Sequence, residues 1–156
     1  MAPGHSDEPA GDSAVYGVVP FEERLGVALA AAARALGTRY RTSLARLQLT
    51  YPQFQVMQVL WEDGSLMVGT LADRLALDIS TISPLLKRLE TRGLVSRRRD
   101  PRDERRVVIT PTSQGLELRR EEEAILRQVS LATRLTPAQE RDLVRQLKRL
   151  TRLLEQ

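Results

Sequence analysis

Hydroxyl-bearing and basic side chains recur between residues 80 and 88 at positions that a helix places on one face. Hydroxyl groups bond base edges and phosphates, Lys and Arg reach guanine edges and phosphates, and an apolar side chain contacts the thymine methyl group. This chemistry suits a helix in the major groove of double-stranded DNA. The predicted contact residues are Ser80, Thr81, Ser83, Pro84, Lys87 and Arg88.

An arginine-rich stretch follows this helix. Residues 95–99 and 105–109 are β-prone and flank a segment rich in turn formers, which predicts a hairpin. Arginine at a hairpin tip suits the strongly negative minor groove of A·T-rich DNA, and we expect this role for Arg102 and Arg105, with Asp103 orienting Arg105. The other arginines suit phosphates. The predicted contact residues of the hairpin are Arg97, Arg98, Arg99, Arg102, Asp103, Arg105 and Arg106.

The positive charge of the chain is concentrated in these two features. Residues 87–106 contain nine Lys and Arg against four Asp and Glu, a net charge of +5. The whole chain carries +4, so the remainder carries −1. A localised basic surface indicates a polyanionic partner.

Two short helices must position the polar face. Apolar residues recur with helical spacing from Val68 to Leu75 and again from Ile82 to Leu89, and a turn separates the two runs. Asp78 suits the N-cap of the second helix, and Gly93 its end. Helix, turn, helix and hairpin in this order predict a winged helix-turn-helix.

The flanking sequence predicts further helices. One spans 20–47, a second begins at the capping box of Thr50 and Gln53, and a strand at 65–67 pairs with the hairpin. A helix with Pro111 at its first position runs to about residue 132. A second capping box, Thr136 with Gln139, starts a last helix ending near Leu154.

Composition excludes several function classes. There is no cysteine, and the single histidine, His5, lies in a Pro- and Gly-containing N-terminal stretch, so we expect no thiol chemistry, metal, cofactor or enzymatic activity. No apolar run approaches the roughly 20 residues of a membrane span. The N-terminus lacks the order of an export signal, which predicts a cytoplasmic protein.

The stretch LADRLALDISTISPLLKRLETRGLVSRRRDPRDERRVVITPTSQG resembles the core of MarR-family transcriptional regulators, including Asp103 and Arg105 of the wing and the following Thr110. The resemblance implies a homodimer, joined by its first and last helices, that binds a palindromic operator. LTYPQFQVMQVLWEDG and the DNA-reading segment are most similar to the organic hydroperoxide sensors of that family, the OhrR type. Tyr40 and Tyr51 match two tyrosines that hold the reactive cysteine of those sensors, but Gly26 stands at the cysteine position, which implies no cysteine-based peroxide sensing.

The predicted fold is mostly α with a small β-hairpin wing, a winged helix-turn-helix in a MarR-like homodimer. We expect a disordered tail at 1–18 and one domain at 19–156, with dimerisation helices at 19–48 and 111–156 and a DNA-binding lobe at 50–110. The predicted function is a sequence-specific DNA-binding regulator, a repressor acting at an inverted repeat.

Three alternatives stay open. In the first, the chain is a constitutive DNA-binding protein without an effector. In the second, it is a helical adaptor whose basic hairpin binds an acidic protein. Alternatively, a small-molecule effector occupies a pocket at Tyr40, Tyr51 and Trp61, although aromatic rings at helical spacing more often fill a core.

Overall fold

The computed structural model of the chain describes residues 19–100 and 103–156. The predicted disordered tail at 1–18 and the predicted minor-groove residue Arg102 lie outside the described residues. The chain forms two compact units, Met1–Ala35 and Leu36–Gln156.

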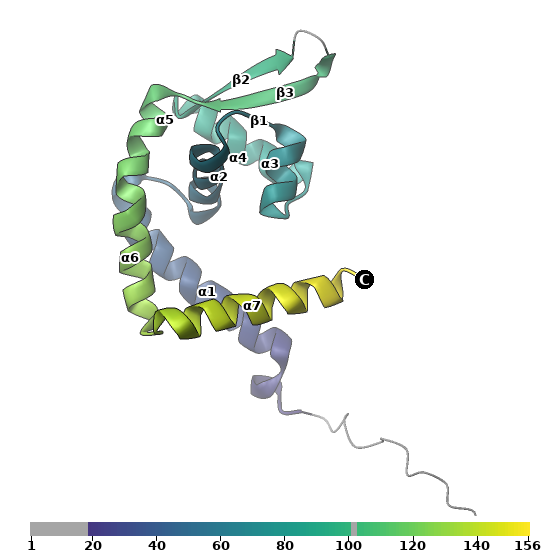
Figure 1. Cartoon of the computed structure of the whole chain (residues 1–156), viewed down its shortest axis with the longest axis vertical. Helices are drawn as coiled ribbons and strands as arrows, with labels where there is room; N and C mark the ends of the chain where they lie inside the picture. Colours follow the sequence, from purple (N-terminus) through teal and green to yellow (C-terminus); the bar gives the residue numbers. More distant parts are fainter. Residues whose placement is uncertain (1–18, 101–102) are drawn as a thin grey trace, which may run out of the picture. The chain divides into compact units, whose positions relative to one another are not determined.

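The first unit contains the 3-10 helix η1 (Phe21–Glu23) and the start of α1 (Leu25–Leu44), which continues into the second unit. The helix predicted at 20–47 is therefore confirmed, with a 3-10 turn at each end. The second unit contains the remaining elements in the order of Figure 1: η2 (Ala45–Leu47), α2 (Tyr51–Asp63), β1 (Leu66–Met67), α3 (Val68–Leu75), α4 (Ile79–Thr91), β2 (Val95–Asp100), β3 (Asp103–Pro111), α5 (Ser113–Glu117), η3 (Leu118–Glu121), α6 (Glu122–Thr133) and α7 (Pro137–Leu154).

Helix α2 begins at the predicted capping box. The Thr50 side chain accepts a hydrogen bond from the Gln53 N–H at 3.4 Å, and Gln53 Oε1 accepts one from the Thr50 N–H at 2.9 Å. The two bonds satisfy backbone donors that a helix start leaves unpaired. Fixed in this way, α2 turns Phe54, Met57 and Leu60 into the core, where they are fully buried.

The helix-turn-helix forms where it was expected. Helix α3 ends at Ala76, which adopts the left-handed conformation with φ 51°, and Asp78 occupies the N-cap of α4. The Asp78 side chain makes no capping hydrogen bond in the described structure, so only its position matches the prediction. One side of α4 is fully buried through Ile82, Leu86 and Leu89.

A left-handed turn at Gly93 ends α4. Gly93 has φ 71°, its N–H donates to the Glu90 carbonyl at 2.8 Å, and the Leu94 N–H donates to the Leu89 carbonyl at 3.0 Å. These two bonds form the Schellman motif, and Leu94 supplies its buried apolar residue. The predicted helix stop at Gly93 is confirmed.

Arg92, the C-cap residue of α4, joins this turn to the start of the second unit. Its guanidinium donates to the Gln48 carbonyl at 2.6 Å and to the Leu47 carbonyl at 2.8 Å. Both carbonyls lie at the end of η2, where Gln48 has a φ of 52°. The end of the predicted DNA-reading helix is therefore bound directly to the connection between α1 and α2.

The three strands form an antiparallel sheet in the order β1-β3-β2. Leu66 pairs with Ile109 and Met67 with Val108, which confirms the short strand predicted at 65–67. In the hairpin Arg97 lies opposite Ile109 and Arg98 opposite Val108, and the register shifts between Arg99 and Asp100.

The prediction of a helix start at Thr110 and Pro111 is wrong. Both residues belong to β3, and Pro111 pairs with Val95 at the end of the ladder. A proline is tolerated there because the end of a strand does not require its N–H. The helix begins at Ser113, with Thr112 as the N-cap, so the hairpin extends one residue past the predicted lobe boundary at 110.

The helix predicted to run from there to about residue 132 is interrupted. The 3-10 turn η3 separates α5 from α6. Ile125 and Val129 on α6 are buried, as their helical spacing indicates. The following capping box of Thr136 and Gln139 starts α7 as predicted.

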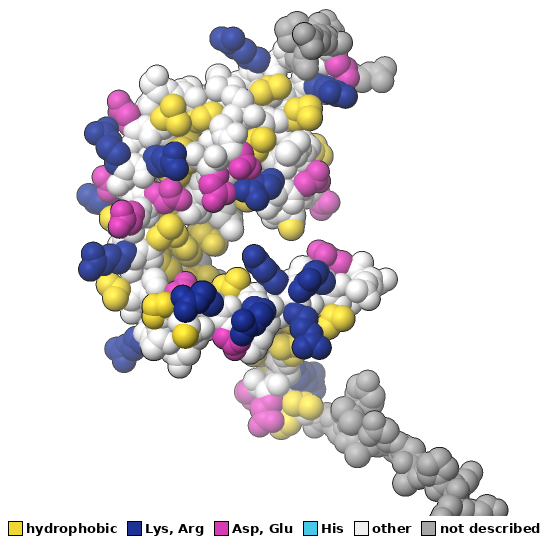
Figure 2. Space-filling model, in the orientation of Figure 1, with side chains coloured by type: hydrophobic (Ala, Val, Ile, Leu, Met, Phe, Trp, Pro, Cys, Tyr) yellow, Lys and Arg dark blue, Asp and Glu magenta, His cyan; other side chains and the backbone are white. Residues whose placement is uncertain are grey.

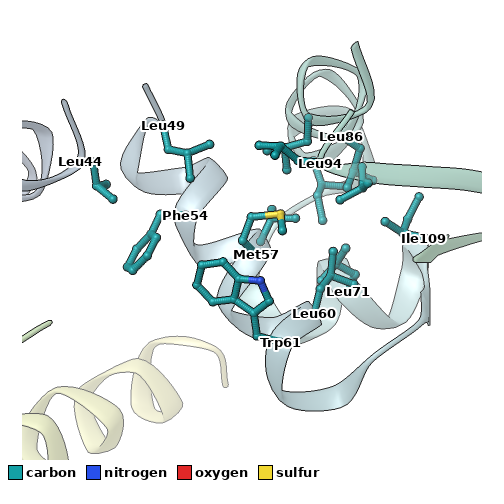
Figure 3. Close-up of a cluster of buried hydrophobic side chains, with 14 of the residues drawn as sticks. Leu44, Leu49, Phe54, Met57, Leu60, Trp61, Leu71, Leu86, Leu94 and Ile109 are labelled. Carbon is teal, nitrogen blue, oxygen red and sulfur yellow. The ribbon is translucent and has the colours of Figure 1, made fainter. Parts of the chain in front are cut away.

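One core joins α2, α3, α4 and the sheet. Figure 3 shows Met57 and Trp61 of α2 beside each other, with Leu86, Leu94 and Ile109 on the side of the sheet. Trp61 is 4% exposed and donates its indole N–H to the Gly115 carbonyl at 2.9 Å, which attaches α5 to the same core.

Gly115 supplies a first prediction. A Cβ added there would overlap the Leu94 carbonyl oxygen and lie 3.1 Å from Met57 Cε. Because the first neighbour is backbone, the substitution Gly115→Ala must displace α5 or the α4–β2 turn, and we expect a loss of about 1–3 kcal/mol in the free energy of unfolding. Urea denaturation measures this loss.

Gly69→Ala is the matched control, since a Cβ on this glycine of α3 has no neighbour within 4 Å. It should leave the stability unchanged or slightly raised. Equal stability of Gly115→Ala and the wild type would contradict the close packing of Gly115 on Leu94.

Candidate nucleic-acid interface

The predicted DNA-contact residues of α4 form a face, the reading face, that lies at the surface. Five of its six residues are exposed, and Ser83 is half-buried at one edge; the five are Ser80, Thr81, Pro84, Lys87 and Arg88. The opposite side of α4 is buried in the core, so the burial pattern fixes which side chains face solvent. The structure therefore brings all six predicted residues onto one helix face.

The hydroxyl hydrogen of Ser83 is used in a hydrogen bond within α4. Ser83 Oγ donates to the Ile79 carbonyl one turn earlier, at 2.7 Å. A serine hydroxyl has one donor and two acceptor lone pairs, so its remaining capacity is to accept. Any direct base contact by Ser83 is then restricted to amino groups of cytosine or adenine.

The hairpin arginines differ in their surroundings. Arg97 Nη1 lies 4.0 Å from Glu90 Oε2, and Arg106 Nε lies 3.2 Å from Asp103 Oδ2. Arg98 and Arg99 are exposed and form no ion pair within the part of the chain that the structure describes. Figure 2 shows dark blue basic side chains on both sides of the grey hairpin tip.

The Asp103 carboxylate forms one ion pair that the sequence analysis did not predict. It pairs with Arg106, three residues later. The Arg105 backbone lies in β3, but its side chain is outside those described, as is all of Arg102. The predicted pair of Asp103 with Arg105 and the predicted role of the two tip arginines stay predictions.

A hollow of about 540 Å³ lies where α3, α4 and the hairpin meet. Two of its lining residues were missed by the sequence analysis: Met67, at the end of β1, and Ile79, the first residue of α4. Ile79 has no role in the sequence analysis, and its spacing of three residues from the buried Ile82 is typical of a core position. Its place directly after the N-cap was the signal that could have identified it. The other lining residues are Val68, Gly69, Thr70, Asp73, Ser83, Arg97, Arg106 and Val107.

The three aromatic residues predicted as a ligand pocket are packed. The rings of Tyr40 and Tyr51 stack with centroids 3.9 Å apart, and Phe54 lies 6.2 Å from Tyr40 and 5.8 Å from Trp61. Tyr40 is 9% exposed. This geometry supports the core-filling interpretation, and the ligand pocket stays a prediction.

Two properties of the described residues bear on other functions. No group of three or more His, Cys, Asp or Glu among them is arranged to hold a metal ion. No helix in the same residues combines the length and apolarity needed to cross a membrane.

Two helices joined by a tight turn, followed by an antiparallel wing with basic side chains, define a winged-helix DNA-binding fold. The model of the MarR family matches residues 49–107. The chain is 35% identical over 131 residues to the HTH-type transcriptional regulator MgrA of Staphylococcus aureus, covering 83% of this chain and 86% of MgrA. The chain therefore belongs to the MarR family of transcriptional regulators.

Two further relatives share a shorter segment. Over 95 residues the chain is 50% identical to the HTH-type transcriptional regulator TtmR of Methylorubrum extorquens and 39% identical to the organic hydroperoxide resistance transcriptional regulator of Bacillus subtilis. Each match covers 61% of this chain, but only 49% of TtmR and 65% of the Bacillus protein. The predicted resemblance to hydroperoxide regulators is confirmed.

Solved structures agree with the fold. Reduced AbfR bound to DNA matches with a TM-score of 0.71 and 27% identity, covering 85% of this chain and 92% of AbfR. BpsR of Bordetella bronchiseptica, whose DNA binding is regulated by 6-hydroxynicotinic acid, matches with a TM-score of 0.78 and 27% identity, covering 86% and 98%.

The tyrosine pair gives a pH prediction. Burial raises the pKa of Tyr40 to about 12, and the charge and hydrogen bond of Tyr51 and the charge of Glu140 act in the same direction. Because this folded-state pKa exceeds the ordinary value of 10.0, the contribution of Tyr40 to stability is full below about pH 10 and is lost as the pH rises through about 12. We expect the ultraviolet phenolate titration of the folded protein to contain one component near pH 12.

The substitution Tyr40→Phe identifies that component by removing it. Tyr51→Phe, which keeps the burial of Tyr40 but removes the hydrogen bond, should lower its midpoint. If the component lost in Tyr40→Phe titrates near pH 10, the described environment of Tyr40 is incorrect.

Proposed function

We propose that this MarR-family chain is a homodimeric repressor that binds a palindromic operator in double-stranded DNA through α4 and the β2–β3 hairpin. The observation that carries the proposal is the exposed polar and basic face of α4, held in place by the buried Ile82, Leu86 and Leu89. Two such helices related by a two-fold axis contact half-sites about one helical turn, roughly 10 bp, apart.

The charges on this face support DNA as the partner. Neither Lys87 nor Arg88 forms an ion pair within the described residues, although Glu90 lies on the same helix. Unpaired exposed cations are available to phosphates, and binding through them releases counterions. On the hairpin, Arg98 and Arg99 extend the same unpaired positive surface.

The exposed apolar stripe of α7 supports the dimer. None of its residues is buried in the single chain, although the helix has a leucine-rich stripe. Leu143 and Val144 are each 45% exposed, and Leu147 is 39% exposed. Contiguous apolar surface of this kind marks an interaction site, and a second copy of the chain supplies a matching stripe by symmetry. Residues 111–156, together with 19–48, are our proposed dimerisation segments.

The proposed repressor is a cytoplasmic binding protein without catalytic activity. The sequence contains no cysteine, and Gly26 stands where the related sensors carry their reactive thiol, so release from DNA by thiol oxidation is not part of it. A constitutive DNA-binding protein without effector is the second candidate. Titration of small aromatic acids and of oxidants against the DNA complex separates the two, because only a regulated repressor is released.

The substitutions Lys87→Ala and Arg88→Ala test the interface. Each should weaken operator binding, by about 1–3 kcal/mol if the side chain contacts a base. If the side chain contacts a phosphate, binding weakens on all sequences and the slope of log K against log salt falls by about 1. Fluorescence anisotropy at several salt concentrations measures both quantities.

Arg74→Ala is the matched control, since Arg74 is an exposed cation on α3 that already pairs with Glu62 and Asp63, outside α4, the hairpin and the proposed dimerisation segments. It should leave the affinity and the salt slope close to the wild-type values. Equal effects of all three substitutions would show a non-specific charge effect and would contradict the proposed interface.

A further inference from the structure

Ile79 is an unusual residue for the first turn of α4. Ile79 is 52% exposed, whereas Ile82, three residues later, is fully buried. A β-branched apolar side chain exposed at this position adds little to helix stability, and Ile lies below straight-chain residues in helix propensity. Folding of the single chain therefore gives Ile79 no evident role.

A second exposed apolar residue shares the same hollow. Met67 is 41% exposed and lines the hollow between α3, α4 and the hairpin together with Ile79. Val68 and Val107 extend this apolar wall. A lone exposed hydrophobic residue needs no explanation, but four apolar side chains around one hollow form a surface that can receive an apolar group.

The charged residues beside these four apolar side chains indicate which partner carries the apolar group that they contact. Arg97 and Arg106 line the same hollow together with one carboxylate, that of Asp73, and the Arg106 side chain stays 59% exposed although it pairs with Asp103. Apolar side chains flanked by arginines complement DNA, which combines phosphates with one apolar group on its base edges. That group is the C5-methyl of thymine, which unmodified DNA presents only in the major groove.

The position of Ile79 in α4 points to the same contact. In helix-turn-helix proteins the N-terminal residues of the recognition helix contact base edges. Ser83 lies one turn after Ile79 and also lines the hollow, with its hydroxyl donating to the Ile79 carbonyl. A hydrogen-bond acceptor and an apolar side chain thus lie next to each other on the edge of α4 that faces the hairpin.

We propose that Ile79 is a specificity-determining residue that contacts a thymine methyl group in each operator half-site, and that Met67 extends the apolar surface beside it. The inference rests on the proposed DNA-binding function. It adds an apolar contact to the predicted hydroxyl and cationic ones, and it assigns the hollow to DNA rather than to a small molecule.

Replacement of single thymines by deoxyuridine tests this contact, because the exchange removes only the methyl group. With the wild-type dimer, one position in each half-site should lose about fourfold in affinity, equivalent to about 0.8 kcal/mol for one buried CH₂-sized group. Ile79→Ala should bind the thymine operator several-fold more weakly and become insensitive to deoxyuridine at that position. Ile79→Val should keep an intermediate sensitivity.

Glu62→Ala is the control variant, since Glu62 is an exposed residue of α2 outside α4, the hollow and the proposed dimerisation segments. It should show the wild-type response to every deoxyuridine, and unchanged melting temperatures should show that all variants fold. A wild-type protein that binds no inverted repeat overturns the proposed function itself. Tight binding with no sensitive thymine, or equal sensitivity in Ile79→Ala and the wild type, overturns only the role of Ile79.

Discussion

The turn at Arg92, Gly93 and Leu94 is the constraint on which the arrangement of the DNA-binding unit depends. Arg92 binds the end of η2, Gly93 accepts a hydrogen bond from the Thr112 hydroxyl at 2.6 Å, and the Leu94 carbonyl accepts one from the Thr112 N–H at 3.1 Å. The same Leu94 carbonyl packs so closely on Gly115 that a Cβ at this position would overlap its oxygen. Three residues thus join α4 to the α1–α2 connection, to the wing and to α5.

The contacts of this turn explain how the apolar core fixes the orientation of the polar face of α4. Because the C-terminal end of α4 is held from three directions and one side is buried by Leu86 and Leu89, the opposite face has a fixed orientation toward the hairpin. Groups that contact DNA need such support from a rigid scaffold.

Much of the fold could be predicted because it depends on local signals. The capping box at Thr50, the stop at Gly93 and the helical spacing of Ile82, Leu86 and Leu89 each specify structure within a few residues. Pro111 was misassigned because proline is as acceptable at the end of a strand as at the start of a helix. Ile79 was missed for another reason: its place beside the hairpin depends on how distant segments of the chain pack together, which helical spacing alone does not encode. The same holds for Arg106 as a partner of Asp103.

Selection of bound duplexes from a random DNA pool, followed by sequencing, tests the central claim most directly. Two α4 helices related by a two-fold axis should enrich inverted repeats whose half-sites are centred about 10 bp apart. Footprints on the selected sequences should protect both half-sites together. Enrichment of single, unpaired motifs, or retention of duplexes without any shared motif, would contradict a dimer that reads a palindromic operator through α4.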